Sequence, residues 1–177
     1  RAEVAAYDEP VVYARSTPYQ RIVLTRRGDD LRLYLNGNLQ FSSRDEYRYH
    51  EALVWPVLGR VTHPRSVLIL GGGDGLAARE VLRDPRVERV TLVDLDPAMT
   101  ALFRQTPNLA ALNEGALSSP KLRVINADAF RWVREQSARH DAIIVDFPDP
   151  TEFALGKLYT ESFYRELARL LSPTGVM

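Results

Sequence analysis

The chain has 177 residues, of which 45% are apolar, enough to bury the core of one domain with or without a small appendage. Lysine and arginine balance aspartate and glutamate at 23 each, so bulk charge favours neither nucleic acid nor an anionic membrane as a partner. The lack of cysteine excludes disulfides and thiolate nucleophiles, and it fits a reducing, cytoplasmic compartment. Three scattered histidines argue against a resident metal.

The first part of the chain predicts a small antiparallel sheet. Residues 1–18 show no period and are expected to form an extended arm. Two alternating segments, Gln20 to Thr25 and Leu31 to Leu35, predict a hairpin. Asn36-Gly37 is a strong turn signal, and a third short strand is expected after it. We therefore expect an N-terminal arm and β-hairpin domain over residues 1–44.

A helix is expected next, from about Asp45 to Leu58, with acidic residues in its first turn and Pro56 as a bend or an end. It is followed by an apolar strand, Ser66 to Leu70, which runs into Gly71-Gly72-Gly73-Asp74-Gly75 and a helical segment. A strand, a glycine turn and a helix start form a nucleotide-binding corner, because glycine lets the ligand approach the backbone. Asp74 would repel a phosphate, so the corner favours a ligand that is uncharged or cationic there.

After the corner, strands and helices alternate as far as the last residues. The strands are expected at 89–94, 122–126 and 142–146, and the helices from 97, 129 and 163. This alternation predicts an α/β fold with a Rossmann-like, methyltransferase-type doubly wound parallel sheet over residues 45–177. A new strand begins at the last residues, so we expect the C-terminal strands to be truncated.

Each predicted strand of this sheet ends on acidic residues. Because the carboxyl ends of parallel strands form one ligand-binding edge, these acids are expected to converge on a site that attracts a cation. They are Asp74, Asp94, Asp96, Asp128, Asp146 and Asp149.

Three of these acids have more specific expectations. Asp94 lies about 20 residues after the glycine turn, where such folds hold a ribose diol, although it could instead cap the next helix. Asp128 suits an adenine contact, a helix cap, or both. Asp146 opens the proline-stiffened loop Asp146-Phe147-Pro148-Asp149-Pro150, which is expected at the substrate mouth. His50 and Tyr49, considered alone, are more simply packing residues of their helix.

Taken together, the motifs resemble the spermidine synthase family of polyamine aminopropyltransferases. The matching stretches run in the family's order through most of the chain. They are Tyr19-Gln20, Leu35 to Gln40, Asp45 to Glu51, Gly71 to Gly75 with Arg79 to Leu82, Asp128-Ala129, Asp146 to Pro150, and Leu158-Tyr159 with Phe163-Tyr164.

The resemblance implies binding of decarboxylated S-adenosylmethionine as a co-substrate, with no metal. The donor would contact the corner glycines Gly71 and Gly73, with Asp94 on the ribose, Asp128 on the adenine amino group, Gln40 at the nucleoside end and Asp74 at the aminopropyl amine. On the acceptor side, Tyr49 and Asp146 would flank the attacking amine. Gln20, His50 and Asp149 would complete the amine site.

The chain departs from the family pattern in two places. Asp94 stands where the family usually has glutamate, and the usual Asp-Ser-Ser-Asp loop is Asp-Phe-Pro-Asp here, so the choice of amine does not carry over. The sequences of several motifs are similar to those of the family branch in which this domain follows membrane helices. This similarity implies that the chain is the cytoplasmic end of a membrane-anchored parent protein. Pairing of the N-terminal hairpins in a homodimer stays open.

Two other functions share these features. An S-adenosylmethionine-dependent methyltransferase would use the same fold and ribose acid, but the donor's carboxylate would be repelled by Asp74. A non-catalytic polyamine- or nucleoside-binding domain would bind the same ligands without turnover.

Overall fold

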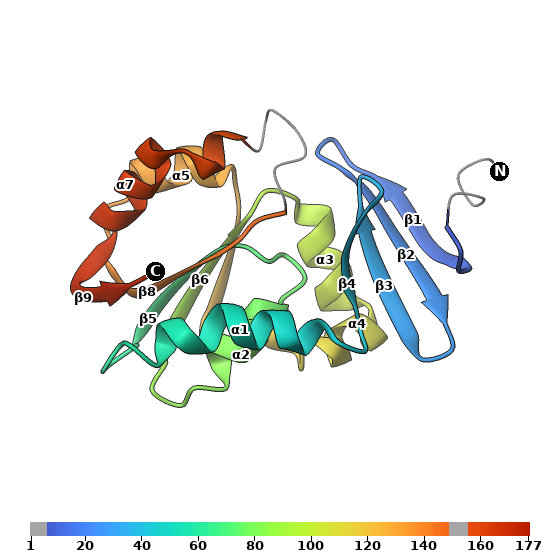
Figure 1. Cartoon of the computed structure of the whole chain (residues 1–177), viewed down its shortest axis with the longest axis horizontal. Coiled ribbons are helices and arrows are strands. Elements are labelled where there is room, and N and C mark those ends of the chain that lie inside the picture. Colours follow the sequence, from blue (N-terminus) through green and yellow to red (C-terminus); the bar gives the residue numbers. More distant parts are fainter. Residues whose placement is uncertain (1–6, 149–155) are drawn as a thin grey trace. The chain divides into compact units, whose positions relative to one another are not determined.

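The computed structural model of the chain describes residues 7–148 and 156–177. The chain divides into two compact units, Arg1–Tyr49 and His50–Met177, so the division falls inside the first helix (Figure 1). Asp149, predicted to help hold the amine, lies outside the described residues.

The first unit contains an antiparallel sheet with the strand order β1-β2-β3-β4. The strands are β1 (Val11–Ser16), β2 (Arg21–Arg27), β3 (Asp30–Leu35) and β4 (Asn38–Ser42). The predicted hairpin and third strand are confirmed, and Asn36 and Gly37 both have positive φ, 51° and 82°, as the predicted two-residue turn requires. The expected extended arm is only partly correct, because β1 within it pairs with β2 as an edge strand.

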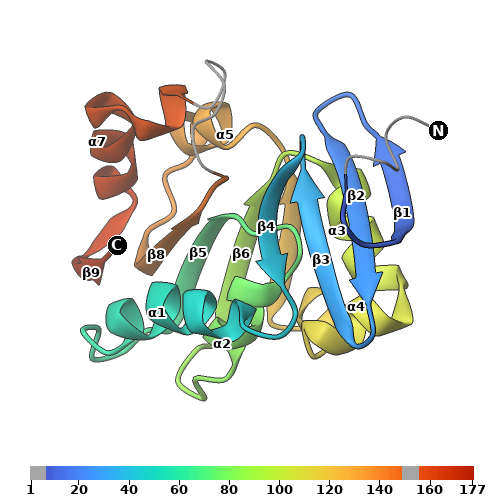
Figure 2. The same cartoon turned by 45° about the vertical axis from the view of Figure 1, so that its right-hand side comes forward.

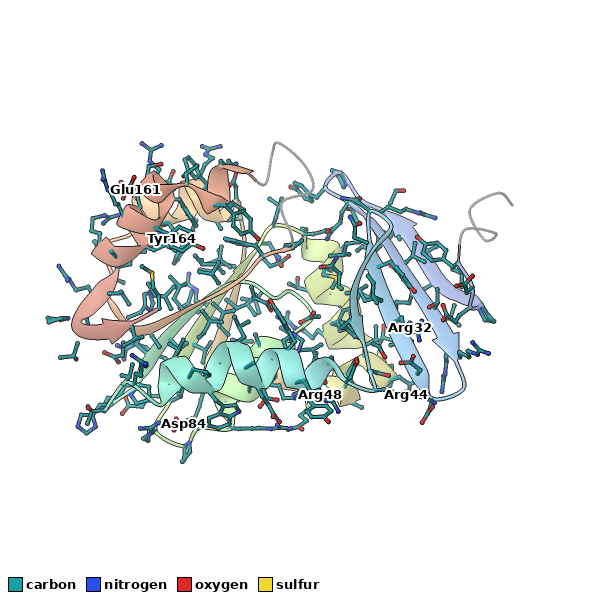
Figure 3. All side chains as sticks on the ribbon, viewed as in Figure 1. Arg32, Arg44, Arg48, Asp84, Glu161 and Tyr164 are labelled. Carbon is teal, nitrogen blue, oxygen red and sulfur yellow. The ribbon has the colours of Figure 1, made fainter. Side chains whose placement is uncertain are left out.

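Apolar side chains and a buried ion-pair network stabilise this sheet. Leu33 and Phe41 pair across β3 and β4 and are both buried. The Arg32 guanidinium donates to Glu9 at 2.6 Å and to Asp30 at 2.9 Å, and both carboxylates are buried (Figure 3). Because each carboxylate is paired, the network avoids leaving an unpaired charge inside the unit.

Helix α1 (Glu46–Leu58) follows the sheet, close to its predicted bounds. Pro56 lies within it, and the helix ends two residues later, consistent with the loss of a backbone donor at proline.

The second unit is built on a parallel sheet with the strand order β7-β6-β5-β8-β9 (Figures 1 and 2). The strands are β5 (Ser66–Gly71), β6 (Arg89–Asp94), β7 (Leu122–Asn126), β8 (His140–Asp146) and β9 (Leu171–Val176). All six residues of β5 are buried, because this strand pairs with β6 and β8 and has helices on both faces. The predicted α/β fold class is confirmed.

The helices of this unit are mostly those that the sequence predicts. They are α2 (Leu76–Leu82), α3 (Pro97–Gln105), α4 (Pro107–Leu112), α5 (Ala129–Glu135) and α7 (Glu161–Arg169), with short 3-10 turns η2 (Ala116–Ser118) and η3 (Lys157–Tyr159). Helix α4 and both 3-10 turns were not predicted. Figures 1 and 2 show α5 and α7 on one face of the sheet and α2 on the other.

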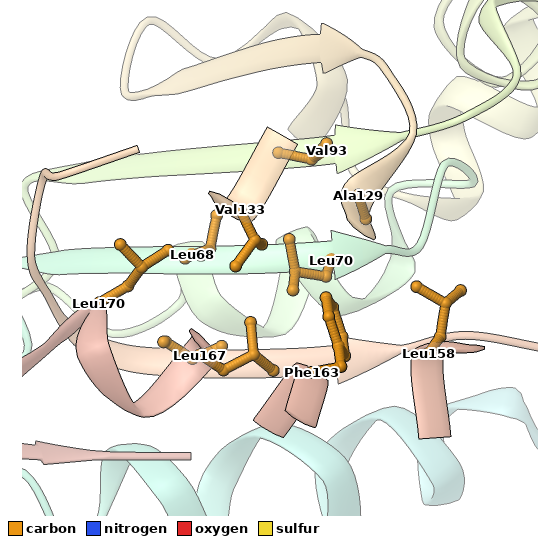
Figure 4. Packing of buried hydrophobic residues seen from close by; sticks show 10 residues of the cluster. Leu68, Leu70, Val93, Ala129, Val133, Leu158, Phe163, Leu167 and Leu170 are labelled. Atoms are coloured by element: carbon orange, nitrogen blue, oxygen red, sulfur yellow. The ribbon is translucent and has the colours of Figure 1, made fainter. Parts of the chain in front are cut away.

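The core under α5 and α7 fixes the sheet against these helices. Leu68 and Leu70 of β5 face Val133 of α5 and Phe163 of α7, and all four side chains are buried (Figure 4). Each side chain of this size contributes about 1.5–3 kcal/mol when it is fully removed from water. This packing holds the ends of β5, β6 and β8 in a fixed arrangement, and the candidate site lies at those ends.

Candidate functional site

The glycine corner follows directly from β5 and lies against the end of β8. Gly71 and Gly72 have φ of 83° and 67°, a region that other residues rarely adopt. A Cβ on Gly71 would lie 2.1 Å from the Asp146 carbonyl oxygen, and the Gly72 N–H donates to that same oxygen at 3.2 Å. Glycine is therefore required for the corner to pass beside Asp146.

Asp74 is held at the start of α2. Its side chain is 9% exposed, and its Oδ1 accepts a hydrogen bond from the Leu76 N–H at 2.9 Å. The Asp74 carbonyl accepts a second bond, at 2.9 Å, from the Nδ2 of the fully buried Asn113. Asn113 was not predicted, because it lies 39 residues away in a segment with no recognisable motif.

Asp94 faces the glycine corner. One carboxylate oxygen accepts from the Gly73 N–H at 3.0 Å and the other from the Asp96 N–H at 2.9 Å. A Cβ on Gly73 would lie 2.6 Å from the Asp94 Cγ, so glycine is needed here for space. The alternative expectation, that Asp94 caps the next helix, is wrong: Asp96 is the N-cap of α3, through the Ala98 N–H.

The environment of Asp94 disfavours its charge. Burial raises its pKa from 3.8 to about 6, and the negative charge of Asp74 adds to the increase, while the N–H groups of Asp96 and Gly73 oppose it. With a pKa of about 6 the carboxylate is still roughly nine-tenths ionised at pH 7. It can therefore accept two hydroxyl donors at neutral pH.

His50, Asp74 and Asp146 converge beside the corner. One ligand atom from each side chain lies within 4.8 Å of the others, although the residues come from α1, the corner and the end of β8. His50 is 3% exposed and Asp74 is almost as buried. The sequence predicted that acids from separate strands meet at this edge, and the structure brings Asp74, Asp94 and Asp146 there.

Asp128 is engaged through both of its carboxylate oxygens. Oδ1 accepts from the Phe130 N–H at 2.9 Å and caps α5, while Oδ2 accepts from Lys157 Nζ at 2.6 Å. Burial alone would raise its pKa, but the hydrogen bond and charge of Lys157 outweigh burial and keep the pKa below its usual range. The cap was one of the two expectations, whereas Lys157 was missed.

The loop after β8 packs against η3 and α7. The Tyr159 hydroxyl donates to the Pro148 carbonyl at 2.7 Å, and the Phe147 ring lies 6.2 Å from that of Phe163, centroid to centroid. The Thr160 hydroxyl accepts from the Phe163 N–H at 3.3 Å and caps α7. These contacts fix the described part of the loop that carries Asp146.

Three predicted site residues belong to the first unit. Gln20 precedes β2, and Gln40 lies on β4, where its Nε2 donates to the Asn38 carbonyl at 3.1 Å. Tyr49 lies on α1 beside His50, but its side chain is 54% exposed. Successive helix residues point about 100° apart, which explains the contrast between these neighbours. Contact of Gln20, Gln40 or Tyr49 with ligand stays a prediction.

The sheet is parallel, a glycine corner follows its central strand, and an acid from the next strand accepts the corner N–H. This is the architecture of the Rossmann class of domains, in which nucleotides bind at such a corner. Residues 46–177 match the model of the spermine/spermidine synthase domain, and the chain belongs to this family.

Curated relatives align with nearly all of this chain. Polyamine aminopropyltransferase 2 of Ralstonia nicotianae is 57% identical over 176 residues, which are 99% of this chain and 34% of that protein. Polyamine aminopropyltransferase of Mycobacterium tuberculosis H37Rv is 51% identical over 174 residues, 97% of this chain and 32% of that protein. The chain thus spans about a third of the length of the curated relatives it matches.

Solved structures show the same fold. A spermidine synthase in complex with the transition-state analogue AdoDATO superposes with a TM-score of 0.85 at 32% identity, covering 92% of this chain and 55% of that one. Spermidine synthase from Thermotoga maritima gives a TM-score of 0.82 at 31% identity, covering 92% and 54%.

None of the helices described in residues 7–148 and 156–177 has the length and apolar character to cross a membrane. The expected membrane segment of a parent protein and the homodimer both remain predictions.

Proposed function

We propose that this protein transfers the aminopropyl group of decarboxylated S-adenosylmethionine to an amine such as putrescine, giving spermidine and methylthioadenosine. The observation that carries the proposal is the convergence of His50, Asp74 and Asp146 at the glycine corner, beside Asp94. A site with this many carboxylates favours ligands that bring positive charge, and both the donor and a protonated amine do so. The names of the curated relatives support the same reaction.

The donor nucleoside is assigned to the corner and the strand ends next to it. The backbone at Gly71 and Gly73 approaches the ligand closely, and the Asp94 carboxylate accepts the two ribose hydroxyls. Asp128 accepts the adenine amino group through lone pairs that remain beyond its bonds to Phe130 and Lys157, since a carboxylate offers about four such sites.

The rest of the donor has three assigned contacts. Asp74 pairs with the donor's aminopropyl ammonium group, and Gln40 contacts the nucleoside end. Because Asp74 is fixed by its bond to the Leu76 N–H, the ammonium is oriented as well as bound.

The acceptor is assigned to the end of β8. An aliphatic amine has a pKa near 10, so at neutral pH it arrives protonated and cannot attack. Asp146, assisted by Tyr49, accepts or relays one proton, and the freed nitrogen then attacks the methylene carbon next to the sulfonium. The new C–N bond forms as the C–S bond breaks, and the sulfur leaves as the neutral thioether of methylthioadenosine.

The remaining residues of the acceptor site hold the amine in line. Gln20 and His50 contact it near the reacting nitrogen, and Asp149 pairs with the far ammonium group. Positioning of this kind is the main way in which a displacement with two bound reactants is accelerated.

A test of the reaction is the substitution Asp146→Asn, which keeps the size of the side chain and removes its basicity. We expect the rate of methylthioadenosine formation by the purified protein to fall about 10²- to 10⁴-fold. Asp141→Asn is the matched control, because Asp141 lies near the other end of β8, where its carboxylate accepts the Ser66 N–H at 2.9 Å. An Asp146→Asn variant with the full rate would show that the base is assigned wrongly, whereas donor binding without any turnover in the unaltered protein would favour the non-catalytic binding domain.

A further inference from the structure

The group formed by His50, Asp74 and Asp146 has the composition of a transition-metal site. Histidine nitrogen and aspartate oxygen are both zinc ligands, and catalytic zinc sites use three protein ligands and leave a fourth position for water or substrate. Magnesium and calcium prefer sites made entirely of oxygen ligands, with six or more in total. The His50 imidazole therefore favours a zinc-like ion over these harder cations.

The three ligand atoms are close enough for one ion to bind all of them. Zinc bonds of 2.0–2.2 Å at tetrahedral angles separate neighbouring ligand atoms by roughly 3.4 Å. The present separations are within 4.8 Å, so side-chain rotations that close the gaps by about 1–1.5 Å suffice. Asp74 already uses one carboxylate oxygen on the Leu76 N–H, and a carboxylate retains further lone pairs for a metal.

The surroundings favour a cation at this point. Asp74 and Asp146 carry two negative charges, and Asp94 lies close enough that the charge of Asp74 raises its pKa. A Cβ on Gly72 would lie 2.9 Å from the Asp146 Oδ2, so the glycine at this position leaves the carboxylate room to move. Two carboxylates within reach of one buried imidazole make this group different from an exposed acidic patch.

We propose that His50, Asp74 and Asp146 bind one divalent transition-metal ion of the zinc class, and that this ion and a protonated amine exclude each other from the site. The first part stands on the geometry of the three side chains. The second part rests on the proposed function, since it takes the donor's ammonium group to bind at Asp74 and the acceptor amine to bind at Asp146. In this role zinc is an inhibitor of the transfer reaction that acts by occupying one carboxylate of each substrate's site.

The test measures metal binding directly and needs no turnover. The purified protein is titrated with zinc chloride by isothermal calorimetry, and we expect one ion per chain. His50→Gln should weaken zinc binding at least about tenfold, since even the loss of a residue that only orients a ligand has an effect of this size. His63→Gln is the matched control, because His63 is exposed and lies beyond the end of α1, and its affinity should match that of the unaltered protein. Magnesium chloride should bind much more weakly than zinc.

Two further measurements keep the test valid if His50→Gln does not fold. Asp146→Asn should weaken zinc binding in the same way. In the unaltered protein loaded with cobalt, the proton NMR spectrum should show hyperfine-shifted ring signals from a single imidazole. The metal site is refuted if zinc does not bind, if His50→Gln and Asp146→Asn bind it as tightly as the unaltered protein, or if cobalt shifts no imidazole signal.

Competition separates this proposal from the proposed function. Excess putrescine should weaken zinc binding, and zinc should raise the KM for the amine and the KM for the donor without changing kcat. Zinc binding that depends on His50 in a protein without transferase activity would overturn the proposed function and leave the metal site intact. Transferase activity that zinc does not inhibit would overturn the mutual exclusion alone.

Discussion

The raised pKa of Asp94 predicts that this residue destabilises the fold at neutral pH. Burial disfavours its charge, so its pKa is about 6 in the folded protein and close to 3.8 when the chain is unfolded. The folded state therefore binds the proton more tightly. The contribution of this group to stability is complete below about pH 4 and is lost as the pH rises through 6. A difference of about two pH units corresponds to about 3 kcal/mol.

The substitution Asp94→Asn removes this titration. We expect the free energy of unfolding of Asp94→Asn, relative to the unaltered protein, to rise by about 2.5 kcal/mol between pH 4 and pH 7 and to stay level at higher pH. Urea unfolding of both proteins across this range measures the difference, in which the titrating groups that do not interact with Asp94 cancel. The same variant should bind the donor weakly, since the amide cannot accept both ribose hydroxyls.

Asp84→Asn is the control of opposite sign (Figure 3). The Arg86 guanidinium, 2.6 Å from the Asp84 carboxylate, lowers the pKa of Asp84 below 3.8, so its contribution to stability is present above that pH and is lost only at more acidic pH. Asp84→Asn should be less stable than the unaltered protein by an amount that is constant from about pH 5 upwards. The reasoning is refuted if the difference for Asp94→Asn is constant from pH 4 to pH 8 or changes in the opposite direction.

Two further substitutions test the corner. Gly73→Ala places a Cβ 2.6 Å from the Asp94 Cγ and should weaken donor binding about 10- to 100-fold by calorimetry, the equivalent of about 1.5–3 kcal/mol for a displaced charged hydrogen bond. Gly156→Ala, whose Cβ meets no atom of the described residues within 4 Å, should bind normally. Equal affinities for the two variants would count against the assigned role of Asp94. Asn113→Ala removes the hydrogen bonds that this side chain donates to the carbonyl groups of Asp74 and Phe103, so it should lower the free energy of unfolding by about 1–3 kcal/mol in urea. An unchanged value would show that this side chain does not hold the corner.

The sequence was sufficient for the central sheet. Strands 89–94 and 122–126 were predicted to the residue, because their apolar residues are bounded by clear turns and by acids at their ends. Helix α4 was missed because it has only six residues and directly follows α3, so periodicity has too little length to act on. The corner and its acid were predicted because both depend on local spacing along the chain.

The rest of the site could not be predicted from the sequence, because it depends on contacts between distant segments. Lys157 pairs with Asp128 across 29 residues, and Asn113 reaches the Asp74 carbonyl across 39. His50 alone was better explained as a packing residue of its helix; only the fold brings it to Asp74 and the end of β8. Local patterns carry no information about which side chain meets which distant loop once the chain has folded.

The central claim is that this corner accepts a donor with an amine in place of the amino-acid carboxylate. The most direct measurement compares the affinities of the purified protein for decarboxylated S-adenosylmethionine and for S-adenosylmethionine by calorimetry. Because the buried Asp74 carboxylate attracts an ammonium group and repels a carboxylate, the decarboxylated nucleoside should bind more tightly, and Asp74→Asn should narrow the gap between them. Tighter binding of ordinary S-adenosylmethionine would contradict the claim and point to a methyltransferase.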